Sequence, residues 1–226
     1  MGSTLVSRTY HELRQRIDVA AQRAGHEVTL LAVSKTKPAA AIRELVALGQ
    51  LAFGENYVQE ALTKQRELHS LLLQWHLIGP LQSNKARDVA EHFDWLQSLD
   101  REKLIAPLNR YRPESMPPLN VLIQVNIDDE ASKSGCAPEL IPTLAEKIAA
   151  SPRLALRGLM AIPAPHADPE LRQAAFRSMR ELMQRLRETH PHVDTLSLGM
   201  SDDFELAIAE GATLVRIGSA LFGTRA

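Results

Sequence analysis

The sequence contains a single cysteine, Cys136, in 226 residues. A disulfide within the chain is therefore excluded, and a cysteine-based zinc site nearly so. Long apolar runs are also missing: near-continuous apolar stretches reach only about eight residues, far short of the ~20 that span a bilayer. Residues 1–10 are polar and lack the apolar core of a signal peptide. These absences predict a cytoplasmic protein that does not enter a membrane.

An excess of charge of one sign is absent as well. The chain has 26 Lys and Arg against 27 Asp and Glu, for a net charge of −1 at pH 7. This balance argues against a strongly cationic nucleic-acid binder and against an acidic disordered tail. The sequence shows no low-complexity segment and no linker that resembles a domain boundary. We therefore expect one domain over residues 1–226, and the composition permits a monomer, which is the state we expect.

Short apolar runs rich in Leu, Ile and Val recur along the chain, and each is bounded by turn residues. Runs of this length and composition are typical of buried parallel strands. The predicted strands are residues 29–33, 51–53, 74–78, 95–99, 120–127, 156–162, 195–198 and 213–217.

Amphipathic stretches separate the apolar runs and predict helices. In residues 138–150, for example, Leu140, Leu144 and Ile148 recur at helical spacing. The other predicted helices between strands are residues 38–48, 59–68, 84–92, 101–111, 168–189 and 203–210, and an extra helix over residues 5–25 precedes the first strand.

Eight strands alternating with helices predict the α/β class and a closed (β/α)₈ TIM barrel with an extra N-terminal helix. The alternative is an open doubly wound sheet, which we disfavour because no G-x-G-x-x-G motif follows the first strand. Functional side chains of such barrels lie at the carboxyl ends of the strands, so the residues that leave each strand are the candidates for chemistry.

Lys35 directly follows the first predicted strand, after Leu-Leu-Ala-Val-Ser. Burial at a strand end disfavours the ammonium form and produces a nucleophilic amine, which can form a Schiff base with an aldehyde. The simpler interpretation is a lysine that points into water. Lys37 is close enough to affect Lys35 through like charge, or it is an ordinary surface lysine of the next helix. The sequence leaves these alternatives open.

Arg216 lies inside the last apolar run, where an arginine needs an anionic or acceptor partner. A ligand and a structural salt bridge to a carboxylate inside the barrel are both compatible with this position.

Small residues follow the last two strands, in Gly199-Met200-Ser201 and Gly218-Ser219. Phosphate groups in TIM barrels are often bound by the loops after strands seven and eight, where backbone N–H groups face the ligand. We therefore expect a phosphate site there. The two aspartates that follow Ser201 count against it, unless they are first-turn charges of the next helix that face away.

The remaining candidates have simpler alternatives. Asn56 either donates a hydrogen bond to a ligand or caps the next helix, and Lys133 either reaches over the barrel mouth or is a solvated loop lysine. His76 is expected to point into the barrel as a core histidine, and Cys136 to pack inertly. No metal site is expected.

Six stretches of the sequence resemble the pyridoxal phosphate (PLP) homeostasis protein family, which is related to the alanine racemase barrel. The resemblance covers essentially the whole chain. It is carried by residues 32–37 (AVSKTK), 53–57 (FGENY), 75–85 (WHLIGPLQSNK), 157–160 (RGLM), 196–203 (LSLGMSDD) and 215–218 (VRIG).

The resemblance implies a fold type III PLP barrel with PLP as cofactor. Lys35 matches the lysine that forms the internal aldimine with the C4′ aldehyde of PLP, and Arg216 matches the arginine that faces the pyridine nitrogen. Further cofactor-binding positions are Asn56, Met200, Ser201, Gly218 and Ser219, of which Ser201, Gly218 and Ser219 match phosphate contacts, and secondary roles in PLP handling fall to Lys37 and Lys133.

The function implied is intracellular PLP homeostasis, by buffering or delivery of PLP, with PLP-dependent apoenzymes as candidate recipients and no nucleic-acid or membrane partner. An arginine at the ring nitrogen leaves the ring a weak electron sink, so little or no catalytic turnover is expected and no catalytic residue is assigned. The sequence also ends at Ala226, soon after the eighth strand, without the β-rich domain that supplies a tyrosine base in racemases. The alternatives are a single-domain PLP-dependent amino-acid racemase and a barrel enzyme for another phosphate ligand.

Overall fold

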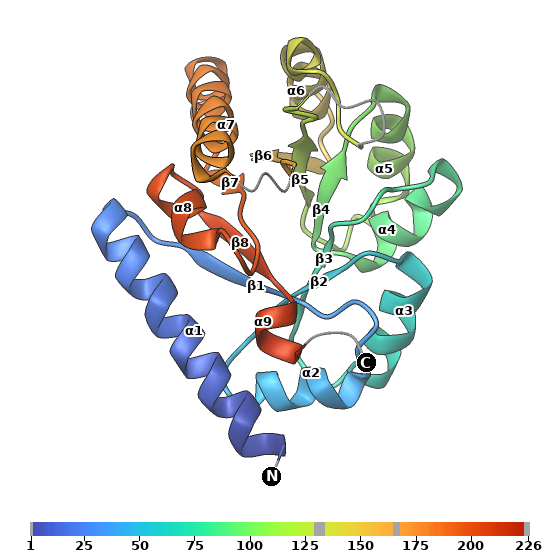
Figure 1. The fold of residues 1–226 in the computed structure, drawn as a ribbon. Coiled ribbons are helices and arrows are strands. Elements are labelled where there is room, and N and C mark those ends of the chain that lie inside the picture. The colour runs from blue at the N-terminus through green and yellow to red at the C-terminus, as the bar shows by residue number, and fades with distance from the viewer. Residues whose placement is uncertain (1, 129–133, 165–167, 224–226) are drawn as a thin grey trace.

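A computed structural model describes residues 2–128, 134–164 and 168–223, and its strands form a closed parallel barrel in the order β1 to β8 (Figure 1). The prediction of a closed barrel in place of an open sheet is confirmed. The strands are β1 (Thr29–Val33), β2 (Ala52–Glu55), β3 (Gln74–Leu77), β4 (Trp95–Leu99), β5 (Leu119–Gln124), β6 (Leu154–Met160), β7 (Thr195–Ser197) and β8 (Leu214–Ile217).

Helices surround the barrel on the outside (Figure 1). They are α1 (Gly2–Ala24), α2 (Ala39–Val46), α3 (Val58–Glu67), α4 (Ala86–His92), α5 (Ile105–Tyr111), α6 (Ile141–Ala149), α7 (Pro169–Thr189), α8 (Phe204–Ala209) and α9 (Ser219–Phe222), with short 3₁₀ turns at Ser83–Lys85, Glu102–Leu104 and Pro138–Leu140. None of the described helices has both the length and the apolar character needed to cross a membrane.

Two predicted helices begin later than expected because of proline. Residues 101–111 and 138–150 each start with a 3₁₀ turn, and the α-helix follows at Ile105 and Ile141. Proline lacks the N–H group that an α-helix interior uses, so it is tolerated only in the first turn. Pro107 and Pro142 each lie in the first turn of their helix, which places the start of α5 and α6 just before them.

The fifth strand is shorter than its apolar run. β5 ends at Gln124, although the run continues to Ile127. At this point another segment joins the pairing: Cys136 N–H donates to the Gln124 carbonyl at 2.8 Å, and Asn126 N–H donates to the Cys136 carbonyl at 2.9 Å, while Val125 N–H still donates to the Met160 carbonyl of β6. The apolar run therefore indicates which residues are buried. It does not show where the strand ends, because that depends on the segments with which the backbone forms hydrogen bonds.

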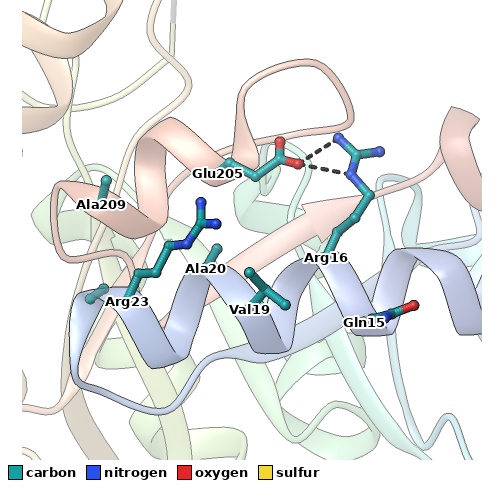
Figure 2. A pocket seen from close by; sticks show the side chains of 8 residues that line it. Gln15, Arg16, Val19, Ala20, Arg23, Glu205 and Ala209 are labelled. Atoms are coloured by element: carbon teal, nitrogen blue, oxygen red, sulfur yellow. Dashed lines mark hydrogen bonds and ion pairs between the residues drawn. The ribbon is translucent and has the colours of Figure 1, made fainter.

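α1 is the extra N-terminal helix, and it packs on α2, α8 and α9 (Figure 1). Its buried side chains, among those described, are Tyr10, Leu13 and Ile17, and the guanidinium of Arg16 lies 4.8 Å from the centre of the Phe204 ring. Figure 2 shows Arg16 paired with Glu205 of α8, with Arg16 Nη2 2.6 Å from Glu205 Oε1. α1 therefore supports the two helices that follow β7 and β8.

A hollow of about 490 Å³ lies between α1 and α8, on the outer face of the barrel (Figure 2). Its charged lining includes Arg16 and Glu205, which pair with each other. Barrels of this fold place their functional groups at the carboxyl ends of the strands.

His76 of β3 points into the barrel, as predicted, and is 1% exposed. Its ring stacks on that of Trp95, with centroids 5.1 Å apart and planes inclined by 7°. Its Nδ1 accepts a hydrogen bond of 3.0 Å from Gln97 Nε2. Burial lowers the pKa of His76 to about 3, so the ring is neutral over the physiological range.

The neutral His76 predicts a loss of stability in acid. Between pH ~6.5 and ~3 the unfolded chain binds a proton that the folded chain refuses, so the free energy of unfolding falls as the pH drops through this window. From pH 7.5 to 5, His76 alone contributes a loss of about 2 kcal/mol. Urea denaturation at the two pH values measures it. His76→Gln should show a smaller loss than the wild type, and exposed His69→Gln the same loss; equal losses in all three proteins would contradict the assignment.

Candidate functional site

A cavity of about 330 Å³ opens at the carboxyl ends of the strands. This volume is at the lower end of the ~300–1,000 Å³ range of small-molecule sites. Eight of the nine binding residues predicted from the sequence line this cavity. The ninth, Lys133, lies outside the described part of the chain. Those that line the cavity are Lys35, Lys37, Asn56, Met200, Ser201, Arg216, Gly218 and Ser219.

Lys35 lies in a tight turn that leaves β1. The turn covers residues 34–37 and is closed by a 3.0 Å hydrogen bond from the Lys37 N–H to the Ser34 carbonyl. Lys35 is half-buried and lines the cavity. The cavity therefore has an amine in its wall.

Lys37 is tied to the end of the described chain. Its Nζ donates a 3.1 Å hydrogen bond to the carbonyl oxygen of Phe222, the last residue of α9. Lys37 precedes α2, and its hydrogen bond joins the loop after β1 to the helix after β8.

Arg216 is buried inside the barrel, and its described hydrogen-bond acceptors are neutral. Nη1 donates to the Ser197 carbonyl at 2.8 Å and to Ser197 Oγ at 2.7 Å, and Nη2 donates to the Ala161 carbonyl at 2.8 Å. Among the described residues, Arg216 therefore forms no salt bridge to a carboxylate inside the barrel. Burial lowers the pKa of Arg216 to about 10, which leaves the guanidinium charged at neutral pH.

A chain of hydrogen bonds runs from Arg216 across the barrel interior to His76. Ser197 Oγ accepts from Arg216 and donates to Gln97 Oε1 at 2.7 Å, and Gln97 Nε2 donates to His76 Nδ1 at 3.0 Å. Because Gln97 Nε2 is a donor, His76 Nδ1 carries no proton in this arrangement. Ser197 and Gln97 therefore connect the orientation of Arg216 to the neutral ring of His76.

The loops after β7 and β8 meet at two serines. Ser219 Oγ donates to Ser201 Oγ at 3.0 Å, and the Ala220 N–H donates to Ser201 Oγ at 3.3 Å. Asp203 Oδ1 accepts from the Met200 N–H at 2.7 Å, so this carboxylate holds its own loop. Asp202 lines the cavity, which counts against the alternative that both aspartates face away.

Asn56 follows β2 and does not cap α3. Tyr57 occupies the position before the helix, and no side-chain hydrogen bond caps it. The Oδ1 of Asn56 is buried without a hydrogen-bond partner. Because a buried acceptor without a partner is costly, this side chain is suited to receive a donor from a ligand.

A buried ionic group that the sequence pattern did not indicate lies beneath the Lys35 turn. Lys64 of α3 is 5% exposed, and its Nζ lies 2.6 Å from Glu55 Oε1 and 2.7 Å from Glu60 Oε1. Burial raises the pKa of Glu55, even though hydrogen bonds from Lys64 and Ser34 favour its charged form. The four-residue spacing of Glu60 and Lys64 was visible in the sequence, but it is also the spacing of ordinary surface pairs.

Comparison with known families supports the resemblance. The family model described as "Alanine racemase, N-terminal domain" matches residues 9–226. A pyridoxal phosphate homeostasis protein of Pseudomonas aeruginosa is 60% identical over 213 residues, which cover 93% of this chain and 91% of the relative. The protein of the same name from Escherichia coli is 54% identical over 220 residues, covering 95% and 94%.

Solved structures are similar over the whole barrel. PipY of Synechococcus elongatus with PLP bound has a TM-score of 0.83 and 40% identity, covering 96% of this chain and 100% of that chain. Alanine racemase of Corynebacterium glutamicum is 18% identical with a TM-score of 0.71, covering 99% of this chain and 62% of the racemase, and it shows the shared fold alone. The chain belongs to the alanine racemase N-terminal domain family, within the group of the pyridoxal phosphate homeostasis proteins.

Proposed function

We propose that this chain binds PLP in the cavity at the carboxyl ends of the strands, and that it serves PLP homeostasis by buffering or delivering PLP with little or no turnover. The observation that carries the proposal is the meeting of an amine, two loop hydroxyls and a charged guanidinium around one cavity of about 330 Å³. The PLP-bound structure of PipY, 40% identical to this chain, supports it.

The cavity residues fit the parts of PLP. Lys35 Nζ would bond to the aldehyde carbon with loss of the aldehyde oxygen as water, and Arg216 would contact the ring nitrogen. The phosphate would be received by Ser201 and Ser219 and by the backbone at Gly218 and Met200. The buried Oδ1 of Asn56 would accept a hydrogen bond from a donor group of the ligand. When bound, PLP supplies an aldehyde that bonds amines and a ring that withdraws electrons. Every proposed contact comes from one chain, so a monomer suffices.

Two features of the site disfavour turnover. Arg216 stays charged and is fixed by Ser197 and Ala161, so it does not protonate the ring nitrogen, and the ring remains a weak electron sink. Racemisation also needs an acid or base on each face of the reacting carbon. Besides Lys35, only Lys37 and Asp202 among the described cavity residues have side chains that act as acids or bases, and Lys37 Nζ is already bonded to the Phe222 carbonyl.

Exposed apolar side chains at the cavity support exchange of PLP with other proteins. Met200 and Ile162 line the cavity and are each 40% exposed. A ligand held beside exposed apolar groups is accessible to a second protein. We propose PLP-dependent apoenzymes as the recipients.

Lys35→Ala is expected to abolish covalent attachment of PLP, because it removes the only amine proposed to bond the aldehyde. Purified protein is mixed with PLP, its visible spectrum is recorded before and after borohydride, and the adduct is mapped by mass spectrometry. The wild type and the exposed control Lys103→Ala should show an absorption band lost on reduction and a pyridoxyl phosphate mass on Lys35. A wild-type protein that stays colourless with added PLP would overturn the proposal.

Turnover is tested separately on the PLP-loaded protein. A panel of amino acids is incubated with it in deuterium oxide, and exchange at the α-carbon is followed by NMR. No exchange that depends on Lys35 is expected. Rapid Lys35-dependent exchange would instead favour the racemase alternative.

A further inference from the structure

We propose that Glu60 and Lys64 of α3 are positioning residues for Lys35, because they hold Thr36 in a left-handed conformation and so direct the Lys35 side chain to the cavity. This inference rests on the proposed function, in which Lys35 bonds PLP. It adds a role for two residues that do not line the cavity themselves.

Thr36 has a backbone conformation that threonine rarely adopts. Its φ is +64°, and it is the only non-glycine residue with positive φ in the described part of the chain. A β-branched side chain in this region is strained, and such strain persists only where the surroundings fix it. Thr36 comes directly between Lys35 and Lys37, so its conformation sets the directions in which the two lysines leave the turn.

Glu60 supplies the contact that fixes Thr36. The Thr36 N–H donates a hydrogen bond of 2.5 Å to Glu60 Oε1. The same oxygen accepts a hydrogen bond of 2.7 Å from Lys64 Nζ. A carboxylate acceptor makes a backbone hydrogen bond roughly twice as strong as a neutral one. Glu60 is thereby oriented by Lys64 and bonded to the strained residue.

Lys64 also holds the other side of the turn. Its Nζ donates to the Ser34 carbonyl at 2.7 Å and to Glu55 Oε1 at 2.6 Å. Ser34 Oγ donates to the same Glu55 oxygen at 2.6 Å. Ser34, before Lys35, is therefore bonded directly to the Lys64 ammonium, and Thr36, after Lys35, is linked to it through Glu60. Lys35 itself lines the cavity.

The origin of these anchors explains how the turn is placed relative to the cavity. Glu60 and Lys64 are one helical turn apart on α3, and Glu55 ends β2, the strand that pairs with β1. The Lys35 turn is therefore bonded to the neighbouring βα unit. Removal of the Glu60 carboxylate takes away the bond that opposes the strain at Thr36, so the turn relaxes and Lys35 is no longer directed to the cavity.

The test compares Glu60→Ala, the double variant Glu60→Ala/Thr36→Gly and the control Glu67→Ala, an exposed carboxylate on the same helix. The dissociation constant of PLP, measured by absorbance, should rise about tenfold in Glu60→Ala and stay unchanged in Glu67→Ala. Glycine adopts positive φ without cost, so the double variant should return most of the affinity. A merely structural effect on α3 would not be rescued by a change at residue 36.

A second readout does not need PLP. In the apoprotein, the Thr36 amide should exchange hydrogen faster in Glu60→Ala than in the wild type or Glu67→Ala. Unchanged exchange, wild-type affinity in Glu60→Ala, or failure of Thr36→Gly to rescue would each overturn the positioning role. A wild-type protein that exchanges slowly at Thr36 but takes up no PLP would instead overturn the proposed function.

Discussion

Lys64→Met is expected to lower the free energy of unfolding by about 3–5 kcal/mol, because it leaves a buried carboxylate without its cation. Glu55 is 0% exposed, and Lys64 Nζ lies 2.6 Å from its Oε1. The other carboxylate oxygen, Oε2, is buried with no hydrogen-bond partner. Methionine fills similar space but carries no charge, so the charged form of Glu55 loses its main source of stabilisation.

The cost of Lys64→Met should depend on pH. Burial already raises the pKa of Glu55, and loss of the ammonium raises it further. The folded variant then binds a proton at Glu55 at a higher pH than the unfolded chain does. The difference in free energy of unfolding between the wild type and the variant therefore becomes smaller as the pH falls. Denaturation at pH 8 and pH 5 measures this.

Two controls separate the lost charge pair from a packing effect. Glu55→Gln/Lys64→Met removes the buried charge as well and should be more stable than Lys64→Met alone. Lys103→Met changes an exposed lysine and should stay within about 0.5 kcal/mol of the wild type. A double variant no more stable than Lys64→Met, with a deficit independent of pH, would show that the charge of Glu55 does not determine the loss.

Gly79→Ala is expected to lower PLP affinity at least tenfold and stability by roughly 1–3 kcal/mol, because the added methyl group collides with the backbone of Asn56. A Cβ at Gly79 would lie 2.2 Å from the Asn56 carbonyl oxygen and 2.7 Å from its Cα. Gly79 has little freedom to move away, since Ser98 Oγ donates a 2.6 Å hydrogen bond to its carbonyl. Asn56 must shift instead, and with it one wall of the cavity.

Gly25→Ala is the matched control for this prediction. Gly25 has a φ of +76° and no heavy atom within 4 Å of a built Cβ, and it lies at the end of α1. The substitution should cost about 1 kcal/mol through backbone strain alone and leave PLP affinity unchanged. Isothermal titration with PLP and thermal unfolding measure both variants. Loss of stability in Gly79→Ala without loss of affinity would contradict displacement of Asn56.

Features set by local sequence were predicted well. The bounds of β1 and β4 match the predicted residues, because each apolar run stops at a polar turn residue. The eight predicted residues that line the cavity were predicted from their places at or near strand ends, because in a parallel barrel every strand delivers its next residues to one face. α9 was not predicted, since four residues are too few to show a helical period.

Features set by long-range contacts were not predicted. Glu60 and Lys64 look like a surface pair along α3, and only the fold brings them beneath the turn at Thr36. The acceptors of Arg216 are mostly backbone carbonyls, at Ser197 and Ala161, and carbonyl groups carry no sequence signal. A buried arginine can therefore be predicted to need partners, but which partners it has depends on strand neighbours far away in the chain.

The contact between the first and last strands has a consequence for the time course of folding. β1 pairs with β8, and the Lys37 Nζ and Phe222 carbonyl that bond across this seam are 185 positions apart in the sequence. Contacts of such separation form late and slowly. During synthesis at the ribosome, Lys35 emerges long before Arg216 and Ser219, so a partly made chain presents the amine without the rest of the pocket. Capture of PLP should therefore coincide with closure of the barrel, and PLP should act as a ligand that favours the closed form over open intermediates.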